Sequence, residues 1–396
     1  MTAGTRYSDN INKQDGTGRD DLEHRVGIRI LKRSDPGQCR GSLEGNADFL
    51  TYQRNTFSDR VSASLDLVGL CEPTPWLRWN LRDTLRDVRQ NRRDPDTPGN
   101  RELRNVFSTG PTLMLNLSPR DNLFLDLNYQ LTRYETSSSE DSNRYTAAAG
   151  WQRQFTGRWQ GGLLASHSEV DFPRRDEELT QDVVSVNFSR RDPQGRLSGS
   201  IGHTWLKSEL GGIFSSTTKA VTGQLAYDRQ FEAGTLARFQ LRRELTDAST
   251  DIDIDIPGLE LNLQETTAVQ VTGVSVSVSQ PLPEKTNVSL SLSYTESDYQ
   301  RSERKEESYG ADVGLTRVIN DRMQGKLNLG YRREKFDQDD NLVEHTYRPS
   351  VGIDYRQTQN LTWDVLVGME KRHDDGGVGR RYEERFIRAG VIWNLL

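Results

Sequence analysis

Charged and amide side chains that alternate with apolar ones are the residues of this chain most suited to chemistry. Arg78 and Arg82, for example, alternate with Trp79 and Leu81. Guanidinium, carboxylate and amide groups repeated along one face of a wall bind polar or charged solutes. An alternative is that they only solvate the wall and pair with one another across strands. The candidates for a water-facing wall are Arg78, Arg82, Asp126, Arg238, Arg242, Glu244, Asp312, Lys326, Arg332, Asp354, Asp364 and Glu370.

Catalytic groups are not indicated by the sequence. The histidines are scattered, and no serine lies in a Gly-x-Ser-x-Gly turn. His167, Ser168 and Glu169 are adjacent, but a polar strand end explains this triplet more simply than a catalytic site does. There is no glycine-rich phosphate-binding loop. We therefore expect a protein that is not an enzyme and that needs no cofactor.

Three aspartates at alternate positions form the single metal candidate. In a strand, Asp251, Asp253 and Asp255 would project from one side, and carboxylate oxygens are ligands that Ca²⁺ prefers. A solvated loop or strand extension explains the same residues without a metal. We expect no metal site and keep these aspartates as a weak Ca²⁺ candidate.

Long segments of strict alternation predict the elements that carry these residues. Residues 123–131, 288–294, 361–369 and 387–395 each place apolar side chains at every second position. A period of two predicts strands with one apolar face. Short turn signals separate pairs of such segments about every 38–40 residues, at 34–37, 72–75, 118–122, 155–157, 191–195, 232–234, 281–284, 320–322 and 357–360.

Short turns that alternate with longer polar loops are typical of an outer-membrane β-barrel. We predict an all-β fold, a closed antiparallel transmembrane barrel of about 20 strands, with 18 as the alternative, that forms a single domain over residues 1–396. A spanning strand needs about 9–11 residues, so the longer predicted strands should project beyond the bilayer on the loop side. Near Thr272 and Gly273 the apolar phase slips, which predicts a β-bulge.

Composition supports a barrel filled with water. Only 33% of the residues are hydrophobic, yet 7 Trp, 13 Tyr and 12 Phe recur along the chain. Few apolar residues suffice when only an outward band of about 25 Å must be apolar. The net charge of -6 gives no reason to expect nucleic acid. No signal peptide is present, so we expect that the sequence is a mature form with an added Met1.

Cys39 and Cys71 are the only cysteines, and each lies beside a short turn at one end of a predicted hairpin. In the oxidising periplasm this placement favours a disulfide, and two free thiols are the alternative. Neither cysteine has a histidine at zinc-ligand spacing.

Three sequence phrases carry a family resemblance: residues 6–11 (RYSDNI), 79–84 (WNLRDT), and 96–101 (DTPGNR) continuing to 105–111 (NVFSTGP). Over roughly the first 135 residues, the chain resembles a family of outer-membrane β-barrel porins found in exopolysaccharide and surface-polymer gene clusters. The resemblance implies export of a polysaccharide, or support of that export, and it carries over no catalytic residue.

These observations give one leading hypothesis and two alternatives. The first is an outer-membrane channel for polysaccharide export, driven by synthesis or by periplasmic partners, since no nucleotide site is present. The alternatives are a general diffusion porin for small solutes and a barrel sheath around a partner electron-transfer protein. The expected partners are outer-membrane lipid, a polysaccharide substrate and periplasmic export proteins.

Overall fold

The fold consists of β-strands joined by turns and loops. The computed structural model describes residues 1–396 apart from 35–36, 92–93, 213, 248–267, 301, 303, 338–341, 376–380 and 395–396. Two short 3-10 turns, η1 (Pro98–Asn100) and η2 (Ser138–Glu140), lie in loops. Among the residues described, no helix is long and apolar enough to cross a bilayer.

The strands follow the alternating segments closely. In the first half of the chain they are β1 (Thr2–Ser8), β2 (Asp21–Arg33), β3 (Cys39–Tyr52), β4 (Arg60–Thr74), β5 (Leu77–Arg89), β6 (Arg101–Asn116), β7 (Asp121–Tyr134), β8 (Ser142–Gln154), β9 (Trp159–Phe172) and β10 (Glu177–Asp192). In the second half they are β11 (Gly195–Leu210), β12 (Phe214–Gln230), β13 (Leu236–Thr246), β14 (Val269–Leu282), β15 (Thr286–Tyr299), β16 (Arg304–Asn320), β17 (Met323–Phe336), β18 (Leu342–Arg356), β19 (Leu361–Asp374) and β20 (Tyr382–Trp393).

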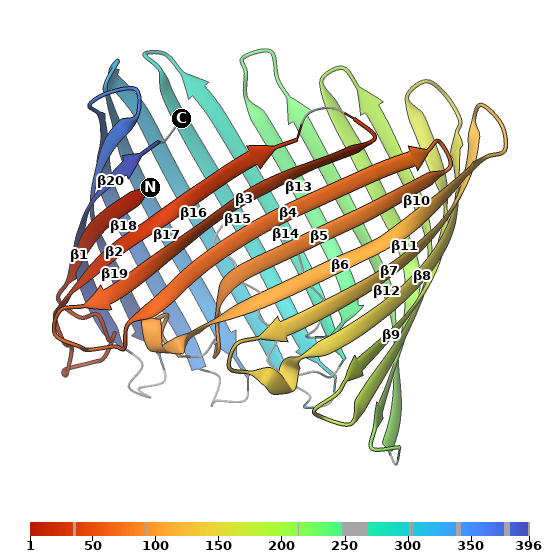
Figure 1. Ribbon diagram of the computed structural model, residues 1–396, viewed down its shortest axis with the longest axis horizontal. Helices are drawn as coiled ribbons and strands as arrows, with labels where there is room; N and C mark the ends of the chain where they lie inside the picture. Colours follow the sequence, from red (N-terminus) through yellow and green to blue (C-terminus); the bar gives the residue numbers. More distant parts are fainter. Residues whose placement is uncertain are drawn as a thin grey trace.

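The sheet closes on itself. Each strand pairs antiparallel with its neighbour in sequence, and β1 also pairs with β20, where Thr2 lies opposite Ile392 and Ser8 opposite Phe386. Because the sheet is closed, it has no edge strand whose backbone N–H and C=O groups would lack hydrogen bonds in lipid. The strands tilt around the barrel in the same sense (Figure 1). The predicted antiparallel barrel is confirmed, with 20 strands rather than 18.

The two ends of the barrel differ as the sequence predicts. All nine predicted short turns fall between consecutive strands, from β2 and β3 to β18 and β19. The N-terminus and the end of β20 lie at this turn side (Figure 1), where the Met1 ammonium donates a hydrogen bond to the Trp393 carbonyl oxygen (2.7 Å). The other end, the loop side, carries the longer connections. One of these, residues 9–20, was not singled out in the sequence.

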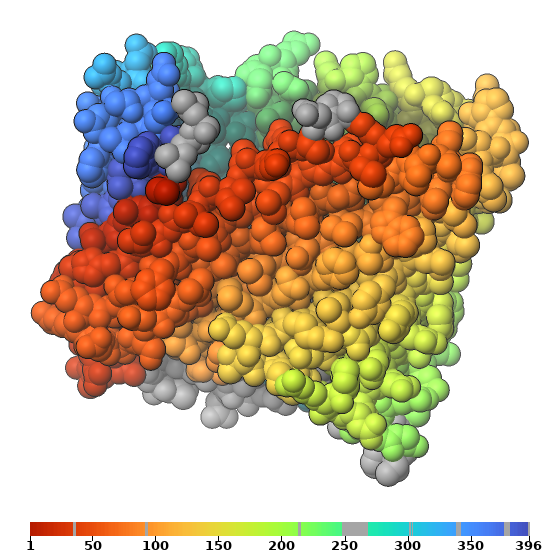
Figure 2. Space-filling model, viewed as in Figure 1, coloured from red at the N-terminus to blue at the C-terminus, as the bar shows by residue number. Residues whose placement is uncertain are grey.

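An apolar band surrounds the outside of the barrel. Its members are exposed residues in the middle of the strands, such as Ile28, Phe49, Leu127, Val186, Ile201, Leu292, Leu329, Val351 and Val367. The strands nearest the viewer form a continuous outer wall (Figure 2). Apolar side chains that face solvent all around a closed barrel belong in hydrocarbon.

Aromatic side chains mark both edges of this band. On the turn side, exposed aromatic residues include Trp76, Trp159, Tyr227, Tyr355, Trp363 and Trp393. On the loop side, three tyrosine pairs lie directly opposite each other across strands, with ring centroids 4.9–5.2 Å apart: Tyr129–Tyr145, Tyr294–Tyr309 and Tyr331–Tyr347. Two aromatic girdles with an apolar band between them are typical of transmembrane barrels. The chain is an integral outer-membrane protein.

The predicted β-bulge is wrong. β14 pairs in unbroken register with both β13 and β15 through Thr272 and Gly273. The apolar phase changes because the apolar residues change faces. Val269 and Val271 point inward and are 0% and 1% exposed, whereas Val276 lies on the outer face, opposite the exposed Leu292. An apolar patch therefore lies inside the barrel at its loop side.

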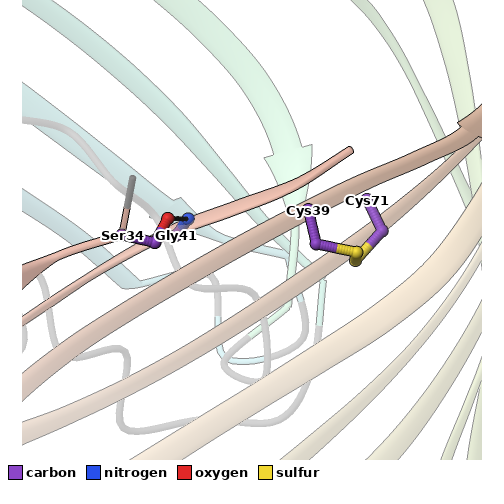
Figure 3. The surroundings of a disulfide bond; sticks show 4 residues. All are labelled: Ser34, Cys39, Gly41 and Cys71. Carbon is purple, nitrogen blue, oxygen red and sulfur yellow. Dashed lines mark hydrogen bonds between the residues drawn. A yellow bond between two sulfur atoms is a disulfide. The ribbon is translucent and has the colours of Figure 1, made fainter. Parts of the chain in front are cut away.

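The predicted disulfide is confirmed. Cys39 and Cys71 lie directly opposite each other on β3 and β4, with their Cα atoms 4.0 Å apart, and their sulfur atoms are bonded (Figure 3). Beside them, the Gly41 backbone N–H donates a hydrogen bond to the Ser34 hydroxyl (2.6 Å). The bond joins the two open ends of the β3–β4 hairpin at the turn side. Short turns of such barrels face the periplasm, where conditions are oxidising.

Candidate functional site: the barrel lumen

The inner face of the barrel is the candidate site, because it is the face opposite the apolar band. Arg78 precedes the outward-facing Trp79 and lies opposite Thr112, which in turn lies opposite Asp126. The same register places all twelve predicted residues, among them Asp312 on β16 and Arg332 on β17, on the inner face. Their role in binding stays a prediction.

Charges on the inner face occur mostly as ion pairs between or along strands. The pairs are Arg78 with Glu72 (2.8 Å), Arg86 with Asp66 (2.6 Å), Arg238 with Asp228 (2.7 Å), Arg242 with Glu244 (2.5 Å), Arg388 with Asp364 (3.2 Å), and Lys326 with Asp354. Asp126 accepts a hydrogen bond from the Thr112 hydroxyl (2.5 Å). This wall is therefore polar and contains both signs of charge side by side.

The wall formed by β14 and β15 is different, because it is lined by small hydroxyl side chains. Three serine pairs lie directly opposite each other across these strands: Ser275–Ser293, Ser277–Ser291 and Ser279–Ser289. Amide groups flank them: the Ser279 hydroxyl donates to Asn287 (3.1 Å) and the Ser275 hydroxyl to Gln240 (3.4 Å). In a barrel of 20 strands, β15 lies halfway around from β5, which carries Arg78 and Arg82. Charged side chains also border the serines on both sides, because Arg238 of β13 lies opposite Ser277 and Asp312 of β16 lies opposite Ser291.

On the loop side, inward-facing charges are buried rather than bathed in water. Glu344 and Glu384 are 1% exposed, Asp374 is 0% exposed and Arg372 is 4% exposed. Arg372 pairs with Glu344 at 3.3 Å. A charge this deeply buried is retained only with partners, so these groups form a packed polar layer. The described wall is open to water on the turn side and tightly packed on the loop side.

Residues 9–20, between β1 and β2, contribute to this packed layer. Ile11 is 1% exposed and packs with Leu50 and Tyr52 of β3. Lys13 is 8% exposed, and its ammonium lies 3.0 Å from Glu370 and 3.7 Å from Glu384. The connection between the first two strands is therefore anchored against the lumen wall by an apolar contact and by a buried ion pair.

The end of β13 also lies inside the wall. β13 pairs with β12 only as far as Arg243, although it continues to pair with β14 up to Thr246. Beyond that point Leu245, 1% exposed, joins an apolar cluster formed by inward-facing residues of the preceding strands. Its members are Val170, Phe172, Leu179, Leu206, Ala220, Leu245 and Ala268. Two layers of chain therefore overlap there.

Polar contacts hold this overlap in place. The Gln181 amide of β10 donates to the Leu245 carbonyl oxygen (2.7 Å). The Arg144 guanidinium of β8 pairs with Asp247 at 2.6 Å, and the side chain of Asp247 is 0% exposed. The Arg144–Asp247 pair thus connects the residue after β13 to a strand five positions away in the barrel.

The loop before β6 has a carboxylate with an altered pKa. Asp96 accepts hydrogen bonds from the Arg101 guanidinium at 2.6 Å and 2.7 Å. Burial acts to raise the pKa of Asp96, but these bonds and the Arg101 charge outweigh it and lower the pKa to about 2. Asp96 is therefore ionised under all ordinary conditions.

The structure does not assemble a catalytic group from His167, Ser168 and Glu169. His167 points outward and contacts Asp182 (2.7 Å), whereas Ser168 points inward, is 6% exposed and bonds with Thr146 (2.9 Å). Successive residues of a strand face opposite sides, so the serine and the histidine cannot cooperate. The Ca²⁺ candidates Asp251, Asp253 and Asp255 lie outside the described residues.

Several lumen features were missed by the sequence analysis. The serines of β14 and β15 occupy alternate positions in the sequence, but alternation alone does not show that small hydroxyl groups line the lumen. The phase slip in β14 was the signal of the internal apolar patch and was interpreted as a bulge. Lys13 and Ile11 lie in a segment without alternation, so no pattern pointed to them.

Comparisons with known proteins identify no family. No family model and no curated protein matches the chain. Similar solved structures include the FrpB iron transporter from Neisseria meningitidis (F3-3 variant), at 9% identity and a TM-score of 0.48, with 99% of this chain and 81% of that chain covered. They also include the copper transporter OprC, at 10% identity, a TM-score of 0.48 and coverages of 99% and 80%. The siderophore receptor PirA from Pseudomonas aeruginosa has 8% identity, a TM-score of 0.43 and coverages of 100% and 80%.

Proposed function

We propose that this protein is an outer-membrane channel through which a polysaccharide is exported. The observation that carries the proposal is a lumen wall that combines paired charges with a strip of serine pairs on β14 and β15. Sugar rings present many hydroxyl groups, which exchange hydrogen bonds with serine, amide and ion-paired side chains alike. Small side chains on β14 and β15 leave room for a sugar chain and hold it by weak, replaceable contacts. The direction of transport follows from the family resemblance of the N-terminal phrases.

A general diffusion porin fits the described wall less well. Such a porin needs a water-filled passage along its whole length. Here the inward-facing Glu344, Asp374 and Glu384 are 0–1% exposed at the loop side. These buried charges do not line a water-filled passage at that level, which favours a channel that opens for its substrate.

Oligosaccharide binding to the purified full chain in detergent tests the proposal. We expect calorimetry to detect binding of neutral oligosaccharides, with affinity that rises with their length. Exchanging two wall serines for a bulky residue, Ser277→Trp with Ser291→Trp, should weaken binding at least tenfold by narrowing the lumen. The matched control is Val276→Trp, which is adjacent to Ser277 in sequence but faces lipid. Equal affinities for both variants, or no binding by the unaltered chain, would reject the proposal.

A further inference from the structure

Two carboxylates and an aromatic ring on β19 and β20 surround the ammonium group of Lys13. Glu370 and Glu384 lie 3.0 Å and 3.7 Å from the nitrogen, and the ring centre of Tyr382 lies 5.7 Å from it. Glu384 is 1% exposed and Tyr382 is 5% exposed. Opposite charge on two sides and an aromatic face on the third is the environment that selects an alkylammonium ion.

This arrangement is held in place by its own contacts rather than by Lys13. Glu384 accepts hydrogen bonds through Oε1 from the Ser8 hydroxyl (2.6 Å) and from Arg6. Glu370 accepts one from the Tyr382 hydroxyl (2.5 Å). Within the described part of the chain, the buried Oε2 of Glu384 has no hydrogen-bond partner, and the Lys13 ammonium lies 3.7 Å from it. This oxygen is therefore available to accept a hydrogen bond from an ammonium group that is better placed than that of Lys13.

Lys13 reaches this position from a connection and not from the barrel wall. It lies in the segment 9–20 between β1 and β2, and its backbone adopts φ 52°, a left-handed conformation that is uncommon for a lysine. The neighbouring Asn10 amide bonds to the Glu383 carbonyl oxygen (3.1 Å), so the segment is fixed close to the carboxylates. The ammonium is thus delivered by a connection between strands and not by the sheet itself.

We propose that Glu370, Glu384 and Tyr382 form a binding site for a primary ammonium group, and that Lys13 fills it as a tethered occupant. A polysaccharide that carries free amino groups competes with Lys13 and releases residues 9–20 from the lumen wall. This inference rests on the proposed function and names the class of polymer. A short tether gives Lys13 an effective concentration on the order of millimolar, so an oligomer with several amino groups competes better than a single amine.

Conductance of the full chain in planar bilayers tests this inference. The probe is a tetramer of glucosamine, and the matched probe is the same tetramer with every amino group acetylated. We expect the amino tetramer at millimolar concentration to raise the conductance at least threefold and the acetylated tetramer to leave it unchanged. Lys13→Ala should show the raised conductance without any ligand and no further response. The control is Lys371→Ala, which removes a lysine–glutamate pair (Lys371–Glu383, 3.2 Å) from the outer face of the same two strands.

A second variant tests the site even if Lys13→Ala does not assemble into a barrel. Glu370→Gln keeps the shape of the site and removes one charge, so it should abolish the response to the amino tetramer. Assembly of each variant is checked by heat-dependent migration of the folded barrel on gels. Equal responses to both tetramers, or a response that persists in Glu370→Gln, would overturn the ammonium site. If both tetramers bind in calorimetry yet act alike on conductance, the export proposal survives and only this site is lost. If neither binds, the export proposal fails as well.

Discussion

The buried ion pair between Arg144 and Asp247 gives the most specific prediction for single residues. Their side chains are 9% and 0% exposed, so removal of one charge leaves the other in a poorly solvated place. We expect Asp247→Asn to lower the free energy of unfolding by about 3 kcal/mol. The matched control is Asp228→Asn, whose partner Arg238 is 56% exposed and whose effect should stay below about 1 kcal/mol. Urea unfolding in detergent measures both, and equal losses would show that the overlap at β13 is not held by this pair.

Asp96 predicts a dependence of stability on pH. Its pKa is about 2 in the folded chain against an ordinary value of 3.8, so the folded state favours the ionised form. The stabilisation is complete above about pH 5 and is lost as the pH falls toward 2. Because the side chain is 38% exposed, the effect is reduced by solvent, and Asp96→Asn should cost about 1 kcal/mol at pH 6. When unfolding is measured at a series of pH values, the free energies of unfolding of the unaltered chain and of Asp96→Asn should converge near pH 2. A difference that persists there would contradict the assignment.

At the residue scale, the sequence predicts which face a side chain occupies better than what it contacts. Arg78 and Asp126 are placed on the inner face by alternation alone. The partner of Arg78, Glu72, lies in the neighbouring strand beyond a turn, and the partner of Glu370 is Lys13, more than 300 positions away. Such contacts depend on the closed register of the sheet, which no local pattern contains.

At the scale of elements, β14 offers a direct test of register. Unbroken pairing places Val271 inside the barrel and Val276 against lipid, whereas a bulge at Thr272 or Gly273 would place both against lipid. We expect a spin label at Val276→Cys to be reached by oxygen dissolved in the bilayer, and a label at Val271→Cys to be shielded. Both changes are made in a chain with Cys39→Ser and Cys71→Ser. Equal oxygen accessibility at the two sites would contradict the unbroken register and favour a bulge.

Strands and turns were predictable because one physical rule governs most of them. A strand with one face in lipid must alternate, as Leu123 to Leu131 do, and a short turn needs residues such as those at 191–195. The rule fails where the inner face is not solvated. Val269 and Val271 break the alternation because they pack inside the barrel, and the segment 9–20 is anchored by packing rather than by pairing.

At the scale of the whole molecule, barrel closure, compartment and the type of function are linked. A chain with 33% hydrophobic residues can fold because lipid covers its outside and water and packed polar groups fill its inside. The same architecture places the serine strip of β15 ten strands from the arginines of β5 in a ring of 20. A polymer entering from the turn side would contact charged side chains and serines before it reaches the packed layer at the loop side.

The most direct test of this account is the amount of polysaccharide outside the cell when the gene is deleted. We predict that a deletion strain retains the polymer in the periplasm and secretes less than about a tenth of the normal amount. The unaltered chain should restore secretion, as should Val276→Trp, whereas Ser277→Trp with Ser291→Trp should not. Normal secretion by the deletion strain would contradict the central claim.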